Sequence, residues 1–203
     1  FLPRYFLQHG PRKYLEYSRD IESSKPWQFF SGRRMLLRQV LSRKLRLQAT
    51  LTSQAFLTNQ SVQSLIPALE AADAPDLRFL LGCINSRLLS WYFVNVNSAA
   101  RRDDFPKIII AQTRQLPIPF KKVGRNGQAA HDRVVKFVDD VLDFHRREQA
   151  AKLPQEKEQI QRQIDATDRQ IDQLVYELYG LSEAEISIVE AASATALDAG
   201  GRR

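Results

Sequence analysis

The chain contains almost no sulfur and no long apolar run, and each absence excludes a class of protein. A single cysteine, Cys83, cannot close an intramolecular disulfide, so a disulfide-stapled secreted domain is excluded and a cytoplasmic location is expected. No apolar stretch approaches the roughly 18 residues that span a bilayer, so no membrane partner is expected. The only methionine is Met35 and no signal-peptide pattern opens the chain, so we expect a piece of a longer polypeptide.

Signatures of catalysis are missing as well. The sequence has no glycine-rich phosphate loop and no metal-ligand spacing among His9, His131, His145 and Cys83. It also lacks the glycine loop and the polar residue beside a proline–aromatic turn that an adenine methyltransferase needs. Cys83 falls on the apolar face of a predicted helix, where it is a small core residue rather than a nucleophile. We therefore expect no enzyme activity, no cofactor and no metal in this chain.

One acidic pair leaves a catalytic alternative open. Asp103 and Asp104, followed by Lys107, have the residue types of a nuclease metal site, in which carboxylates hold a divalent ion and lysine polarises water. No clear strand carrying a second acidic–lysine element follows, and a salt-bridged loop is the ordinary interpretation. A metal-dependent nuclease fragment remains an alternative.

Positive charge is concentrated in the first part of the chain. Residues 1–126, which we call the body, carry 20 Lys and Arg against 8 Asp and Glu, whereas residues 127–203 carry 10 against 15. Because attraction to a polyanion depends on where the charge lies, we expect the body to meet phosphate. A charged surface that only keeps the protein soluble is the alternative.

Hydrophobic periodicity predicts a mixed α/β body of the α+β class, with a small sheet and one clear helix. Apolar residues at three- and four-residue steps after Asp76 predict a helix that ends near Asn95. Residues 1–31, rich in aromatics and proline, are expected to form a covering segment. The other expected elements are a hairpin over 34–50, strands at 55–58 and 62–66, and extended segments at 108–110 and 116–119.

The region after the body is predicted to be helical. A glycine-containing, weakly apolar stretch at 121–128 marks the boundary. Apolar residues then recur at helical spacing from Val134 to Leu142 and from Ile160 to Leu178, with Pro154 near the turn between them. Two long amphipathic helices separated by a short break are expected to pack as an antiparallel pair.

Local signals also mark the end of this pair. Gly180 is placed as a C-terminal cap, and Ser182 with Glu185 forms a capping-box pattern that opens a last short helix. The predicted organisation is a body at 1–126, a helical spacer or docking region at 127–192 and a flexible tail at 193–203.

Arginines and carboxamides gather at the predicted turns of the body. Guanidinium groups match the acceptors of guanine, carboxamides match adenine, and both arginine and lysine neutralise phosphate. For any one of these residues a solvated surface position is the alternative, but the cluster as a whole favours DNA binding. The candidate DNA-binding residues are Arg33, Arg34, Arg38, Gln39, Arg43, Lys44, Arg46, Asn59, Gln60, Ser61, Arg101, Arg102 and Lys107.

Five sequence blocks in order resemble a known family. They are KPWQFFSGRRMLLRQV, AFLTNQSVQSLIP, DLRFLLGCINSRLLSWYF, DDFPKIIIAQTRQLPIPF and IDQLVYELYGLSEAEI. The series, which extends from about Tyr14 to Glu190, is similar to the TaqI-like C-terminal specificity domain of adenine-methylating restriction-modification enzymes, including single-chain type IIG proteins. It also resembles the specificity subunits of type I systems.

The resemblance implies a target recognition domain that binds double-stranded DNA in its major groove. A methyltransferase domain of the same polypeptide would then flip out an adenine and methylate it from S-adenosylmethionine, with Mg²⁺ if that protein also cleaves DNA. Base-contacting positions vary with the target in such families, so no single contact is implied. The main rival is a helical protein-interaction or oligomerisation module in which the basic body serves only solubility.

Overall fold

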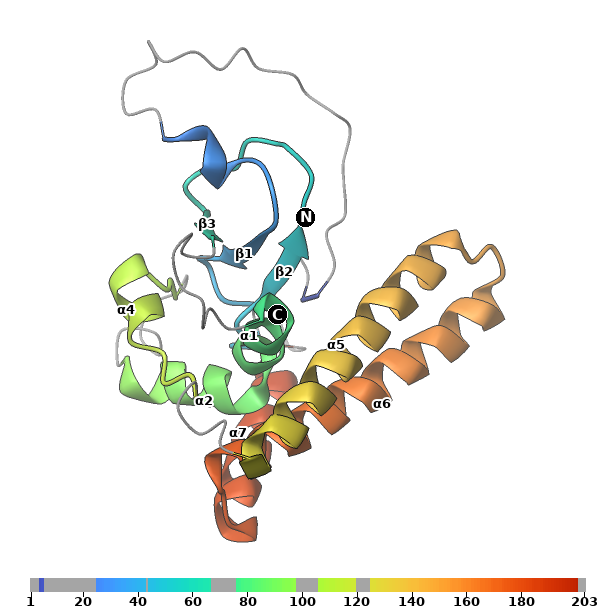
Figure 1. The fold of residues 1–203 in the computed structure, drawn as a ribbon. Coiled ribbons are helices and arrows are strands. Elements are labelled where there is room, and N and C mark those ends of the chain that lie inside the picture. The colour runs from blue at the N-terminus through green and yellow to red at the C-terminus, as the bar shows by residue number, and fades with distance from the viewer. Residues whose placement is uncertain are drawn as a thin grey trace.

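The computed structural model describes residues 4–5, 25–42, 44–66, 76–97, 106–119 and 125–200, with side chains from 127 to 193 in the last range. The body is built on a three-stranded antiparallel sheet of order β2-β1-β3 (Figure 1). Its strands are β1 (Arg34–Arg38), β2 (Ala49–Thr52) and β3 (Val62–Leu65). In the central strand, Leu36 lies opposite Thr50 on one side and Ser64 on the other. The expected α+β class is confirmed.

The predicted hairpin over 34–50 and the predicted strand at 62–66 are confirmed, but the strand predicted at 55–58 is wrong. Residues 55–59 form no regular element, and the backbone N–H of Phe56 instead donates to the carbonyl of Phe30. Phe30 follows a short 3-10 helix, η1 (Trp27–Phe29). The segment around Phe56 therefore lies against the turn after η1 and does not join the sheet.

The helix predicted after Asp76 is two helices, α1 (Leu77–Asn85) and α2 (Arg87–Val96). Ser86 interrupts them with an extended backbone, and its hydroxyl accepts a hydrogen bond from the Leu89 N–H, which caps α2. The apolar period continues across the break because both helices bury the same side. A short α4 (Ile110–Arg114) begins within the segment expected to be extended, so that expectation holds only up to Ile109.

The long helical pair and its local end signals are confirmed. α5 (Arg125–Ala150) and α6 (Pro154–Tyr179) lie antiparallel and project from the body (Figure 1). Gly180 ends α6 with φ of 69°, in the left-handed region that glycine adopts without strain. The backbone N–H of Ser182 donates to Glu185, and the N–H of Glu185 donates to the Ser182 hydroxyl, which completes the capping box.

The last helix is longer than expected. α7 (Glu183–Gly200) includes most of the stretch that the sequence indicated as a loose tail. This stretch is rich in alanine, the residue that loses least on entering a helix. None of the helices within the described ranges combines the length and apolar character needed to cross a membrane.

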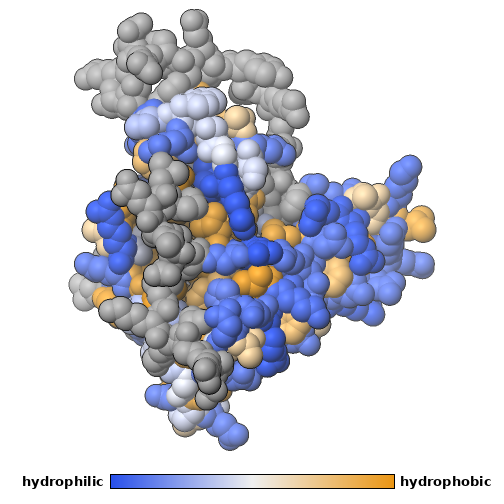
Figure 2. All heavy atoms as spheres, in the orientation of Figure 1, coloured by the Kyte–Doolittle hydropathy of each residue, from blue (hydrophilic) through white to orange (hydrophobic). Residues whose placement is uncertain are grey.

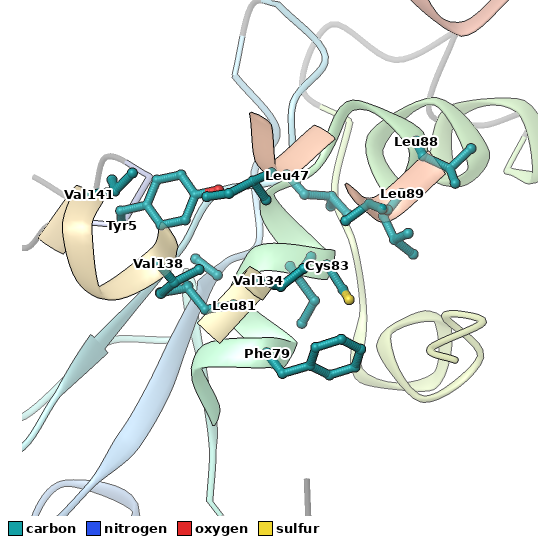
Figure 3. Close-up of a cluster of buried hydrophobic side chains, with 14 of the residues drawn as sticks. Tyr5, Leu47, Phe79, Leu81, Cys83, Leu88, Leu89, Val134, Val138 and Val141 are labelled. Carbon is teal, nitrogen blue, oxygen red and sulfur yellow. The ribbon is translucent and has the colours of Figure 1, made fainter. Parts of the chain in front are cut away.

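One hydrophobic core joins the body to the helical pair. α1 and α5 approach so closely at Gly82 that a Cβ there would lie 2.7 Å from Cγ1 of Val134 and 3.2 Å from Cγ2 of Val138. Cys83 is buried in the same core, and burial raises the pKa of its thiol to about 12, as expected for a core residue. Figure 3 shows Tyr5, Leu47, Phe79, Leu81, Cys83, Leu88, Leu89, Val134, Val138 and Val141 from this cluster.

Candidate nucleic-acid interface

Antiparallel pairing brings separate parts of the sequence to one end of the sheet. The C-terminal end of β1 lies beside the residues that precede β2 and β3, as antiparallel order requires. The backbone N–H of Arg38 donates to the carbonyl of Gln48 (2.9 Å), and the N–H of Gln39 donates to the carbonyl of Ser61 (2.8 Å). The carbonyl of Gln39 accepts from the N–H of Ile108 (2.8 Å). Three other chain segments are therefore fixed around Arg38 and Gln39.

The side chains at this end are polar or cationic and at least partly exposed. Nη1 of Arg38 donates to Oε1 of Gln48 (2.9 Å), which holds the guanidinium beside a carboxamide. Lys107 is exposed and pairs through its backbone with Val40. We call this set the sheet-end cluster, and its members are Arg38, Gln39, Gln48, Asn59, Gln60, Ser61 and Lys107.

The turn before β3 is held by its own side chain. Oδ1 of Asn59 accepts the backbone N–H of Ser61 (3.0 Å), and the carbonyl of Asn59 accepts the N–H of Val62 (3.2 Å). Such Asx turns fix a short polar loop without apolar contacts. Gln60 at its tip is exposed, so its carboxamide is available to a ligand.

Two of the predicted residues lie at the opposite end of β1. Arg33 is 58% exposed and lies 3.6 Å from a carboxylate oxygen of Asp76. Arg34 has no exposed surface, because its guanidinium lies 4.9 Å from the ring centroid of Phe56 and donates to the Gly32 carbonyl (3.0 Å). Burial lowers the pKa of Arg34. We therefore leave Arg34 out of the candidate interface.

Arg46 belongs to the junction between body and helices. Its Nη2 donates to the carbonyl of Asn85 (2.6 Å), and burial, with the nearby charge of Arg4, lowers the pKa of Arg46 to about 10. Arg4 makes two hydrogen bonds of 2.7 and 2.9 Å with the carboxylate of Asp168 on α6. Lys44 is exposed on the turn beside this junction, and with Arg46 it lines a groove of 680 Å³ that faces α6.

A second ion network anchors α2 to the last two helices. Arg87, the first residue of α2, lies 3.2 Å from Asp172 of α6 and pairs with Glu190 of α7. The hydroxyl of Tyr176 donates to the same Glu190 (2.8 Å). Burial raises the pKa of Asp172 to about 6. These contacts fix the base of the helical pair against the body.

The remaining predicted residues fall outside the described parts of the chain. They are Arg43, Arg101, Arg102, Asp103 and Asp104. Within the described ranges, no group of three His, Cys, Asp or Glu side chains has the arrangement of a metal site. The nuclease alternative gains no support from those ranges.

A second groove was not anticipated by the sequence patterns. It has a volume of 710 Å³ and lies along the outer edge of β3, between Phe30 and α4. Gln39 and Gln60 line it as well, so it adjoins the sheet-end cluster, and Arg114 of α4 contributes a cation. The sequence patterns did not reveal this groove, because residues 108–110 were expected to be extended and no helix was expected at 110–114, where α4 carries Arg114 to the groove. Hydrophilic side chains also cover much of the projecting helical pair, seen at the right of Figure 2.

Comparison with known proteins adds a family assignment. A family model described as the TaqI-like C-terminal specificity domain matches residues 4–118. The match takes in the whole sheet with α1, α2 and α4, and it ends before α5. No curated protein matched the chain.

Proposed function

The chain belongs to the family of TaqI-like C-terminal specificity domains, and we propose that it recognises a short sequence in double-stranded DNA through its sheet-end cluster. The family suggests DNA recognition in a restriction-modification context. A specificity domain is not itself catalytic, so the proposal assigns chemistry to a methyltransferase domain, in the same polypeptide, that binds S-adenosylmethionine. Mg²⁺ enters only if that polypeptide also cleaves DNA. The proposed location is the cytoplasm.

The observation that supports this proposal is that chain segments with guanidinium, ammonium and carboxamide side chains are joined through their backbones at one end of the sheet. Arg38 and Lys107 supply positive charge, and Gln39, Gln48 and Gln60 supply paired donors and acceptors. A two-stranded ribbon fits the major groove, where arginine pairs with guanine and glutamine with adenine. The cluster therefore has the groups for both base discrimination and phosphate contact.

The helical pair has a different role in this proposal. The ion pairs that Arg4 and Arg87 make with Asp168 and Asp172 hold α6 against the body. The region from 127 onward carries more acidic than basic residues, so it is unsuited to a phosphate backbone. We assign it to spacing and to contact with the catalytic domain.

The test is DNA binding by the whole chain, after selection of a preferred site from a random duplex pool. We expect Arg38→Ala to weaken binding of the selected site about ten- to a hundredfold and to relax base preference. Lys107→Ala should weaken all duplexes alike and lower the slope of log K against log salt by about 1. Fluorescence anisotropy at several salt concentrations measures both.

Lys157→Ala, an exposed lysine near the tip of the helical pair, is the matched control and should bind as the parent chain does. Binding that does not depend on salt, or equal losses for Lys157→Ala and Lys107→Ala, would contradict the proposal. Concentration-dependent self-association without any duplex binding would support the protein-interaction module instead.

A further inference from the structure

The groove along the outer edge of β3 has the chemistry of a nucleotide site. Phe29 and Ile110 give it an apolar wall, Gln39 and Gln60 give it carboxamides, and Lys25 and Arg114 give it positive charge. Among the described residues that line it, none is acidic. A concave, mainly apolar site with a few convergent polar groups is the usual form of a small-ligand pocket.

Hydrogen bonds hold the two walls of this groove together. Nε2 of Gln63, a buried residue of β3, donates to the carbonyl of Ile108 (2.7 Å), and its Oε1 accepts from the hydroxyl of Thr113 in α4 (2.8 Å). Gln63 thereby uses both ends of its carboxamide to fix α4 to the sheet. The groove is therefore formed before any ligand arrives, and binding does not have to order it.

The shape and charge of the groove select among nucleic-acid ligands. Its volume of 710 Å³ cannot take a double helix, but a single base with its sugar and phosphate fits. A base would stack on the apolar wall. Because every base has a π-face, such stacking does not depend on which base is bound. The carboxamides carry both donors and acceptors, so they can pair with the N3–H and O4 edge of thymine. Arg114 lies at the exposed rim, where a phosphate would remain in contact with water.

We propose that the groove along β3 binds one unpaired nucleotide of the DNA strand that the sheet-end cluster contacts. This inference rests on the proposed function, because Gln39 and Gln60 belong to both surfaces. When an enzyme flips an adenine out of a duplex, the thymine opposite is left unpaired, and this nucleotide is available at the recognised site. An extended peptide added to the outer edge of β3 is the competing occupant, but peptide binding does not require that the charged residues of the lining, Lys25 and Arg114, both be cationic.

The test compares three probes on the whole chain: a fully paired duplex, the same duplex with one unpaired thymine, and a short single-stranded oligonucleotide. We expect the unpaired thymine to strengthen binding on the order of tenfold. Arg114→Ala should abolish this preference, so that both duplexes bind alike, and should weaken the single strand. Arg114→Glu should weaken the single strand further. Arg162→Ala, an exposed arginine on α6, is the matched control and should retain the preference.

The outcomes separate this inference from the proposed function. Loss of paired-duplex binding in Arg38→Ala tests the sheet-end cluster, whereas the preference for the unpaired thymine and its dependence on Arg114 test the groove. No preference for the unpaired thymine, or a preference that survives both Arg114 variants, overturns the nucleotide site. Binding of an extended peptide that is unchanged in Arg114→Ala, with no binding of the single strand, also overturns it in favour of strand addition.

Discussion

The side chain of Arg34, a residue predicted from the sequence to contact DNA, is buried in the interior. Its Nε and Nη2 are buried and make no hydrogen bond within the described part of the chain. Replacing a buried, poorly paired cation with an apolar residue of similar length is often neutral or stabilising. We expect Arg34→Met to leave the free energy of unfolding unchanged or to raise it by about 1–2 kcal/mol. Chemical denaturation measures this.

Arg34→Ala is the comparison, because it removes the charge and also leaves a cavity beside Phe56. It should lose about 2 kcal/mol or more relative to Arg34→Met. A loss of more than about 1 kcal/mol in Arg34→Met would show that the buried guanidinium stabilises the sheet, contrary to this interpretation.

Single residues differ in how far the sequence reveals their role. Gly180 and the Ser182–Glu185 pair act through the backbone a few residues away, so the pattern alone predicts them correctly. The side chains of Arg34 and Arg46 face partners more than 15 residues away, Phe56 and Asn85. No local pattern encodes such contacts, so exposure of these arginines was not predictable.

At Gly82, α1 lies closely packed against α5. A methyl group there would lie 2.7 Å from Cγ1 of Val134, and a β-branched side chain has little freedom to move aside. Overpacking costs about 1–3 kcal/mol, more than the roughly 1 kcal/mol that alanine gains over glycine in a helix. We expect Gly82→Ala to lower the free energy of unfolding by about 1 kcal/mol, measured by urea denaturation.

A second variant at the same contact distinguishes crowding from other causes. Val134→Ala removes the methyl group that the new Cβ would meet, so the double variant should lose less than the sum of the two single losses. Strict additivity would mean that Gly82 is required for some reason other than its proximity to Val134.

Helices and strands, like single residues, are predicted correctly where the signal is local and wrongly where it depends on residues far away in the sequence. Long amphipathic periods gave α5 and α6 correctly, because each buries one continuous stripe. The break at Ser86 was missed because α1 and α2 bury residues on both sides of it, and the apolar spacing runs on. Residues 55–58 have strand-like composition, but β3 occupies the edge of the sheet and the hydrogen bond from Phe56 goes to Phe30.

The distribution of charge divides the chain into two regions, but the hydrophobic core is shared between them. Composition separates a basic body from an acidic helical region near residue 126, and the family match ends at residue 118. The apolar core crosses that line, because Val134, Val138 and Ile171 lie within van der Waals reach of a Cβ built at Gly82. A boundary of surface chemistry is therefore not a boundary of packing, and the predicted division at 126 stays a prediction about function.

Because the core is shared, we expect the body and the helical pair to unfold together. Both tryptophans, Trp27 and Trp91, lie in the body, whereas helical circular dichroism is dominated by α5 and α6. Val138→Ala, at a fully buried position of α5, should lower the free energy of unfolding by about 2 kcal/mol and shift both signals by the same amount. Ile188→Ala, an exposed truncation on α7, should change it by less than about 0.5 kcal/mol. A shift confined to the circular dichroism signal would instead make the body and the helices independent folding units.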